Sequence, residues 1–78
     1  MPNIQIDHTY DFTGLRCPHL PIAVIKAVRE RGVGDVLELS ADDLNAPSSI
    51  TAWANQSGTN LLDMYDDGHT FTFILKVP

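Results

Sequence analysis

Residues 13–27, TGLRCPHLPIAVIKA, decide how the first half of this 78-residue chain folds. Gly14 breaks the extended pattern before it, and from Pro18 onward the residues follow the 3.6-residue period of an amphipathic helix. Proline is tolerated in a first turn because its missing N–H would have no intrahelical partner there. The stretch therefore predicts a loop that leads into a helix from about Pro18 to Arg31, which Gly32 ends.

The expected helix has an apolar side and a polar side. Lys26, Arg29 and Glu30 cluster on the polar side, and basic residues in a last turn suit the helix dipole. Ile22 also falls on the polar side, next to Lys26, so we expect it to be exposed. The opposite side, predicted to face the core, consists of Leu20, Val24, Ala27 and Val28.

Four short segments have the two-residue apolar period or the composition of β-strands. The last two are joined by DDGH, in which Asp67-Gly68 is a strong signal for a hairpin turn. The expected strands lie within residues 3–11, 35–41, 59–66 and 70–77.

A second helix is expected between the second and third strands, from about Pro47 to Ser57. Asn45 is the predicted N-cap, Pro47 suits a first turn, and Gly58 ends the helix. Trp53 is assigned to the core because it belongs to a single apolar stripe formed by Ile50, Trp53 and Ala54.

The order of elements is therefore β-α-β-α-β-β, in one domain that spans residues 1–78. Right-handed crossovers place both helices on the same face of the sheet. We predict an α/β (α+β) fold: a two-layer sandwich with one mixed four-stranded sheet and two helices on one face. The other face of the sheet is then expected to be partly hydrated.

Composition narrows the classes of function. The net charge is −5 and the sequence pI is about 4.7, which disfavours both nucleic acid and an anionic membrane surface as partners. No apolar run approaches the roughly 18 residues that span a bilayer, and the opening MPNIQIDHTY lacks the features of a signal peptide. We therefore expect a cytoplasmic protein, and one cysteine cannot form an internal disulfide.

That cysteine, Cys17, directly precedes the expected helix. The free N–H groups and the positive dipole end of a helix N-terminus stabilise a thiolate, and the adjacent Arg16 adds positive charge. We expect these effects to lower the pKa of the Cys17 thiol below its reference of about 8.5. The alternative is that Cys17 is a small buried filler, although a junction between Arg16 and Pro18 is a poor place for one.

The sequence offers no clear catalytic partner for this thiol. A cysteine nucleophile usually needs a base, but His19 is expected to point away from Cys17, and His8 and His69 to be ordinary surface residues. No metal site is predicted, because these residues lack any recognised ligand spacing. A dithiol site is excluded within one chain. What remains is a single thiol that accepts a group and passes it on.

The stretch DFTGLRCPHLPIAVIKAV, residues 11–28, resembles the signature of the TusA/SirA family of small sulfur-carrier proteins. GDVLELSADD resembles the family's second strand, SSITAWANQSGTNLL resembles its second helix, and the resemblance is essentially ungapped over residues 11–77. It implies a two-layer βαβαββ sandwich like the C-terminal domain of translation initiation factor three, the order that periodicity also predicts.

The resemblance implies a sulfur carrier that holds a persulfide on Cys17 and uses no other cofactor. A cysteine desulfurase or a rhodanese-like protein would donate the sulfur. A DsrE-type protein would accept it, towards tRNA thiolation, molybdenum-cofactor maturation or dissimilatory sulfur oxidation. The chain would be a monomeric relay rather than a free-standing enzyme. Two alternatives stay open: a small thiol-redox enzyme, and a non-catalytic regulatory or interaction module.

Residues near Cys17 receive supporting roles on this interpretation. Arg16 would stabilise negative charge on the sulfur, and Asp11 would anchor the loop by accepting backbone N–H groups. His19 and Ile22 are candidate contacts for a partner protein. The supporting residues of the loop are Asp11, Gly14, Arg16 and Pro18.

The chain also departs from the family's usual pattern. The Cys-Pro-x-Pro motif is CPHLP here, at residues 17–21, so the second proline is displaced by one position. Leu44 follows the acidic pair where many members have proline, and Ser48 and Ser49 stand where many have basic residues. These departures affect the choice of sulfur donor more than the carrier chemistry.

Overall fold

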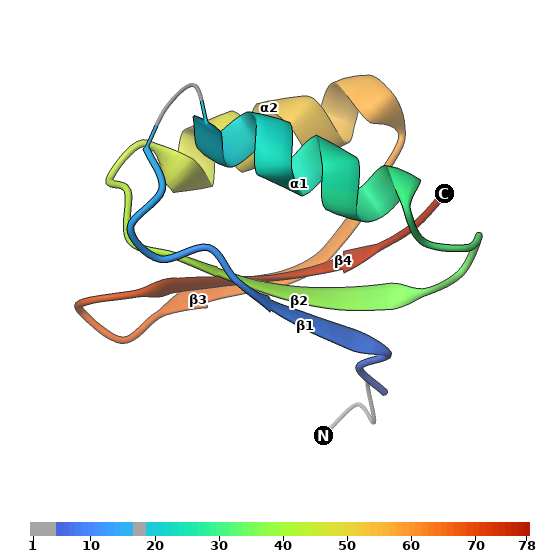
Figure 1. Ribbon diagram of the computed structural model, residues 1–78, viewed down its shortest axis with the longest axis horizontal. Coiled ribbons are helices and arrows are strands. Elements are labelled where there is room, and N and C mark those ends of the chain that lie inside the picture. Colours follow the sequence, from blue (N-terminus) through green and yellow to red (C-terminus); the bar gives the residue numbers. More distant parts are fainter. Residues whose placement is uncertain (1–4, 17–18) are drawn as a thin grey trace.

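The computed structural model describes residues 5–16 and 19–78. Both helices lie on the same face of the sheet, so the molecule has two layers (Figure 1). The elements, in the predicted order, are β1 (His8–Asp11), α1 (His19–Arg29), β2 (Val36–Ala41), α2 (Ala46–Ser57), β3 (Asn60–Asp66) and β4 (Phe71–Lys76).

The four strands form one mixed sheet in the order β1-β2-β4-β3. β1 runs parallel to β2, with Tyr10 opposite Leu39, whereas β4 runs antiparallel to both of its neighbours. This arrangement confirms the predicted fold class. The parallel pairing follows from the α1 crossover, because a strand that is followed by a helix returns to the sheet in the same direction.

The core lies between the helices and the sheet, and α1 presents to it the side that the periodicity predicted. Leu20 is 1% exposed and packs in one cluster with Leu39 of β2 and Phe73 of β4. Ile22, two residues further along the helix, is 61% exposed, as expected. The four residues predicted to face inward are all buried: Leu20, Val24, Ala27 and Val28.

The ends of β1 and α1 differ from the sequence-based boundaries. β1 begins at His8 because the Asp7 carboxylate accepts the Val36 N–H, at 2.8 Å, and takes the place of a backbone acceptor. α1 ends at Arg29 rather than Arg31, because the Arg31 N–H bonds three residues back and tightens the last turn. The predicted start of α1 at Pro18 and the part of the first strand before residue 5 lie outside the described residues.

Helix α2 begins one residue before the predicted start and lacks the predicted side-chain cap. Asn45 occupies the N-cap position, but its backbone already has helical angles, φ −88° and ψ −4°, and its side chain makes no capping bond. A capping side chain needs the extended backbone that such a residue usually adopts. The Asp43 carboxylate accepts the Asn45 N–H instead, at 3.0 Å. Gly58 ends α2 in the left-handed region, φ 76°, as expected.

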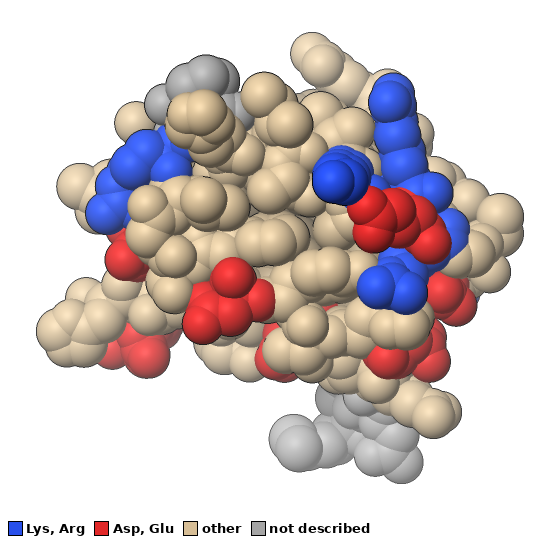
Figure 2. Space-filling model, viewed as in Figure 1, with Lys and Arg blue, Asp and Glu red and all other residues tan. Residues whose placement is uncertain are grey.

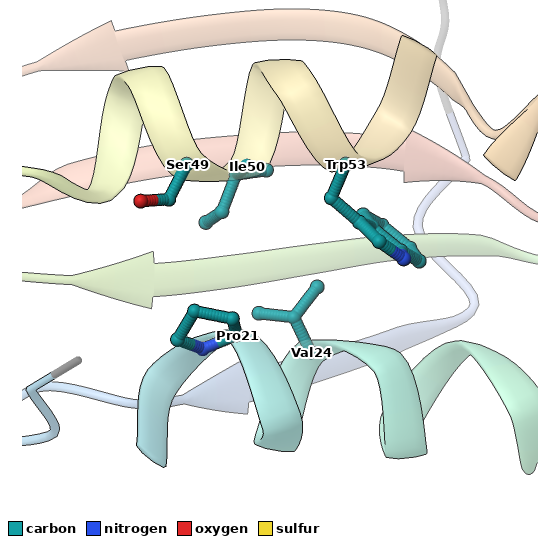
Figure 3. Close-up of a pocket in the computed structure, with 5 residues that line it drawn as sticks. All are labelled: Pro21, Val24, Ser49, Ile50 and Trp53. Atoms are coloured by element: carbon teal, nitrogen blue, oxygen red, sulfur yellow. The ribbon is translucent and has the colours of Figure 1, made fainter. Parts of the chain in front are cut away.

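Two further features of the C-terminal half bear on the predictions. The turn after β3 is the predicted hairpin, in which the Asp67 carboxylate accepts the N–H groups of His69 and Thr70. Trp53, which the sequence predicts to lie in the core, is only partly buried and packs against the core cluster. The reason is that Trp53 lies where α2 faces α1, and not the sheet (Figure 3).

No described helix is long and apolar enough to cross a membrane.

Candidate functional site

Two loops contact each other at one end of the sheet, and the first of these loops leads to Cys17 in the sequence. Because β1 and β2 are parallel, the chain leaves both strands at the same end of the sheet, on the left in Figure 1. The β1–α1 loop contributes residues 12–16 to the described structure, and the β2–α2 loop contributes residues 42–45. The candidate site is built where these two loops contact each other.

Asp11, the last residue of β1, shapes the start of the β1–α1 loop. Its Oδ1 accepts the N–H of Thr13 at 3.0 Å and the hydroxyl of the same residue at 2.6 Å. These bonds lower the pKa of the Asp11 carboxyl, chiefly through the Thr13 hydroxyl. The next residue, Gly14, has a φ of 89°, which other residues rarely adopt. Asp11 therefore holds the start of this loop through one backbone N–H group and one hydroxyl, both from Thr13.

Asp42, the first residue after β2, holds the other end of this loop. Its Oδ1 accepts the Gly14 N–H at 2.9 Å and Nη1 of Arg16 at 2.6 Å. The pKa of the Asp42 carboxyl is lowered, first by the Gly14 N–H and then by Arg16, and the pKa of Arg16 is raised by the same bond. Sequence reasoning missed Asp42, although an acidic residue at the carboxyl end of a strand parallel to β1 is a usable signal.

Arg16 also begins helix α1 through its backbone. Its carbonyl oxygen accepts the N–H groups of His19 at 2.7 Å and Leu20 at 3.0 Å, which are the first bonds of the helix. Its guanidinium points to Asp42 and to the carbonyl of Leu15. Cys17 and Pro18, which follow Arg16 in the chain, lie outside the described residues. The predicted place of the thiol at the helix start therefore stays a prediction.

The three histidines lie on different elements. His19 is exposed on the first turn of α1, and His69 lies in the hairpin turn between β3 and β4. His8 lies at the start of β1, where its Nε2 is 3.7 Å from an Asp35 oxygen. Within residues 5–16 and 19–78, no three histidine, aspartate or glutamate side chains form a group that could hold a metal ion.

Most of the basic residues of this acidic chain lie in α1 and immediately beside it, and two of them, Lys26 and Arg29, are exposed on the helix itself. Residues 16–31 contain four of the five basic residues and one of the ten acidic ones, a net charge of +3, whereas the rest of the chain carries −8. Figure 2 shows Lys and Arg mostly over the helical half of the face in view and Asp and Glu mostly below it. A shallow groove on α1 is lined by Ile22, Ile25, Lys26, Arg29 and Glu30.

The displaced proline, Pro21, packs between the two helices. It lines a small apolar pocket with Val24 from α1 and with Ser49, Ile50 and Trp53 from α2, and the side chains of the two helices point toward one another (Figure 3). The volume, about 10 Å³, is far below the several hundred that a small-molecule site needs. The displaced proline is therefore part of the helix–helix contact.

Comparisons with known proteins agree on one family. A family model described as sulfurtransferase TusA matches residues 8–77. The protein YrkI of Bacillus subtilis, whose name describes a candidate sulfur carrier, is 36% identical over 73 residues that cover 94% of this chain and 97% of YrkI. YedF of Escherichia coli, named in the same way, is 29% identical over 76 residues, which cover 97% of this chain and 99% of YedF.

A solved structure shares the fold. The SirA-like protein of Desulfitobacterium hafniense superimposes with a TM-score of 0.76, over 88% of this chain and 95% of the other. The two chains are 22% identical, so this likeness concerns the architecture alone. It agrees with the two-layer arrangement described above.

Proposed function

Because this chain belongs to the sulfurtransferase TusA family, we propose that it is a sulfur carrier that accepts sulfane sulfur as a persulfide on Cys17. One observation carries the assignment of the site: Cys17 is the only cysteine of the chain. A persulfide forms on a thiol, and the thioethers of the two methionines cannot hold one. The names of the relatives YrkI and YedF support the same class of function.

The proposed chemistry consists of two exchange steps. In the first step the Cys17 thiolate attacks the terminal sulfur of a donor persulfide, a new S–S bond forms, and the donor leaves as a thiolate. In the second step an acceptor thiolate attacks that terminal sulfur, and Cys17 leaves as a thiolate. Each step breaks one S–S bond and makes another, as in thiol–disulfide exchange. No electrons are gained or lost overall, so the relay needs no redox cofactor.

The described residues would serve this chemistry by fixing the chain before the thiol. Asp11 and Asp42 hold the β1–α1 loop through backbone N–H groups, and the Arg16 carbonyl accepts the first bonds of α1. A fixed thiol needs less ordering when it meets a partner. The positive dipole end of α1 would favour an anionic sulfur.

The proposed partners are a cysteine desulfurase or a rhodanese-like protein as donor and a DsrE-type protein as acceptor. The outward face of α1 supports docking close to Cys17 in the chain, since it combines exposed Ile22 with Lys26 and Arg29. Such a face fits a partner surface that presents carboxylates around an apolar residue. His19, exposed on the first turn, would lie at the edge of the contact. The relay would serve tRNA thiolation, molybdenum-cofactor maturation or sulfur oxidation.

The test is to load the reduced protein with sulfur. The protein is incubated separately with a desulfurase plus cysteine, a rhodanese plus thiosulfate, and polysulfide, and intact-mass spectrometry then measures the adduct. We expect one added sulfur that a reductant removes, that Cys17→Ser abolishes and that moves to a DsrE-type acceptor.

The other outcomes of this experiment separate the alternatives. No adduct from any donor, with Cys17 also inert to alkylation, would refute the proposal. Turnover of a peroxide or a mixed disulfide by the protein alone would indicate a thiol-redox enzyme instead. A Cys17→Ser variant that keeps full function in cells would indicate a non-catalytic module.

A further inference from the structure

Asp42 has no part in the exchange steps, yet its carboxylate contacts two residues of the loop that precedes Cys17 in the sequence. One oxygen of its carboxylate binds both the Gly14 N–H and the Arg16 guanidinium, across 28 and 26 residues of sequence. Arg16 in turn bonds the Leu15 carbonyl at 3.1 Å. With standard backbone dimensions, these contacts keep the Asp42 carboxylate within about 10 Å of the Arg16 carbonyl group.

The charges at this end of the sheet come from three elements. Asp11 ends β1, His19 begins α1, and Asp42 and Asp43 follow β2. The Arg16 guanidinium forms an ion pair with the Asp42 carboxylate here, at 2.6 Å. The negative charge of Asp42 opposes the field of the Arg16 guanidinium, so the paired guanidinium acts on its surroundings more weakly than an unpaired one would.

We propose that Asp42 is a positioning residue that controls the reactivity of Cys17 through Arg16. It holds the Arg16 guanidinium in an ion pair, so Arg16 does not act as a free cation. The Cys17 thiol is therefore less acidic than an unpaired Arg16 would make it. Part of this inference rests on the proposed function, because the acidity of Cys17 matters for sulfur transfer only if the protein carries sulfur.

The ionisation of the pair supports a persistent effect. The bonds to Gly14 and Arg16 lower the pKa of the Asp42 carboxyl, and the bond to Asp42 raises the pKa of Arg16. Both groups therefore stay charged throughout the neutral range in which a thiol titrates. Replacing the carboxylate by an amide would leave one uncompensated positive charge on the residue that directly precedes Cys17 in the sequence.

The balance matters because Cys17 must both attack and leave. A more acidic thiol is more ionised at neutral pH, but its thiolate is a weaker nucleophile and a better leaving group. The pairing of Arg16 with Asp42 would keep the pKa of the Cys17 thiol at an intermediate value, at which the sulfur can serve both as a nucleophile and as a leaving group. Asp42→Asn would accordingly favour the release of sulfur and weaken the intrinsic nucleophilicity for its capture.

The test measures the rate of Cys17 alkylation by iodoacetamide against pH, at low ionic strength, and needs no sulfur donor. The midpoint of this profile reports the acidity of the thiol. We expect Asp42→Asn to lower the midpoint by about half a pH unit and Arg16→Gln to raise it. The double variant should have a midpoint between those of the two single variants. In about 1 M salt, where the Debye length is roughly 3 Å, the differences should shrink.

Asp67→Asn is the matched control. Asp67 is also an exposed aspartate that accepts two backbone N–H groups and has a lowered pKa, but its partners are His69 and Thr70 in the hairpin turn. We expect it to leave the midpoint unchanged. An unchanged midpoint in Asp42→Asn, or equal shifts in both Asn variants, would overturn the inference, as would a Cys17 that resists alkylation in the folded protein.

The outcome is separable from that of the sulfur-loading experiment. A midpoint shift without any sulfur adduct would leave the role of Asp42 standing and refute the carrier function. Sulfur loading with an unshifted midpoint would support the carrier function and refute the role of Asp42. Circular dichroism of each variant, together with the Arg16→Gln result, distinguishes a charge effect from a loss of folding.

Discussion

Replacing Leu20 by alanine tests whether α1 is seated on the core as described. Leu20 is 1% exposed and packs against both the sheet and α2, in the first turn of the helix that follows Cys17. Truncation of such a residue removes buried methyl groups and leaves a cavity, which costs about 3 kcal/mol. A chain of 78 residues has a total stability of only about 4–12 kcal/mol. The variant should therefore lose a large part of the free energy of unfolding.

The neighbouring Ile22→Ala is the matched control. Ile22 loses a similar amount of side chain from the same helix, but it is 61% exposed, so its truncation should change the free energy of unfolding by about 0.5 kcal/mol or less. Urea unfolding of the reduced proteins, followed by circular dichroism, measures both. With an m-value of about 1 kcal/mol/M, Leu20→Ala should lower the midpoint by about 3 M. Equal losses in the two variants would refute the orientation of α1.

Three further outcomes are expected. Lys26→Glu with Arg29→Glu should slow sulfur loading by an acidic donor several-fold at low salt, whereas Lys76→Glu on the sheet should not, and equal slowing would argue against docking on α1. Gly58→Ala should cost about 1 kcal/mol in thermal or urea unfolding, because the backbone there has φ 76° although the space around it is open. Folding lowers the pKa of the Asp42 carboxyl, so ionised Asp42 stabilises the folded protein above the unfolded pKa near 3.8. This stabilisation is lost as the pH falls through the lower, folded pKa, and acid unfolding of Asp42→Asn should lack this contribution to the free energy of unfolding.

The local features of this fold are those that the sequence predicts well. The inward side of α1 depends on apolar residues spaced three and four apart, and the hairpin turn depends on Asp67-Gly68. Each pattern is set by residues within one or two turns of chain, so no knowledge of the rest of the fold is needed. The position of both helices on one face then follows from the right-handedness of crossovers, and the helical connection between β1 and β2 accounts for their parallel pairing.

The chemistry around the candidate site is decided by contacts that no local pattern contains. Asp42 meets Gly14 and Arg16 only because β1 and β2 pair side by side and release their loops at the same end. Asn45 has the right residue type for a cap, but the approach of the chain to α2 gives it a helical backbone and leaves the bond to Asp43. The sequence by itself determined the elements, their order and the single thiol. Only the tertiary structure decided which charged groups face each other, because the energy of an ion pair depends on a distance that pairing in the sheet sets.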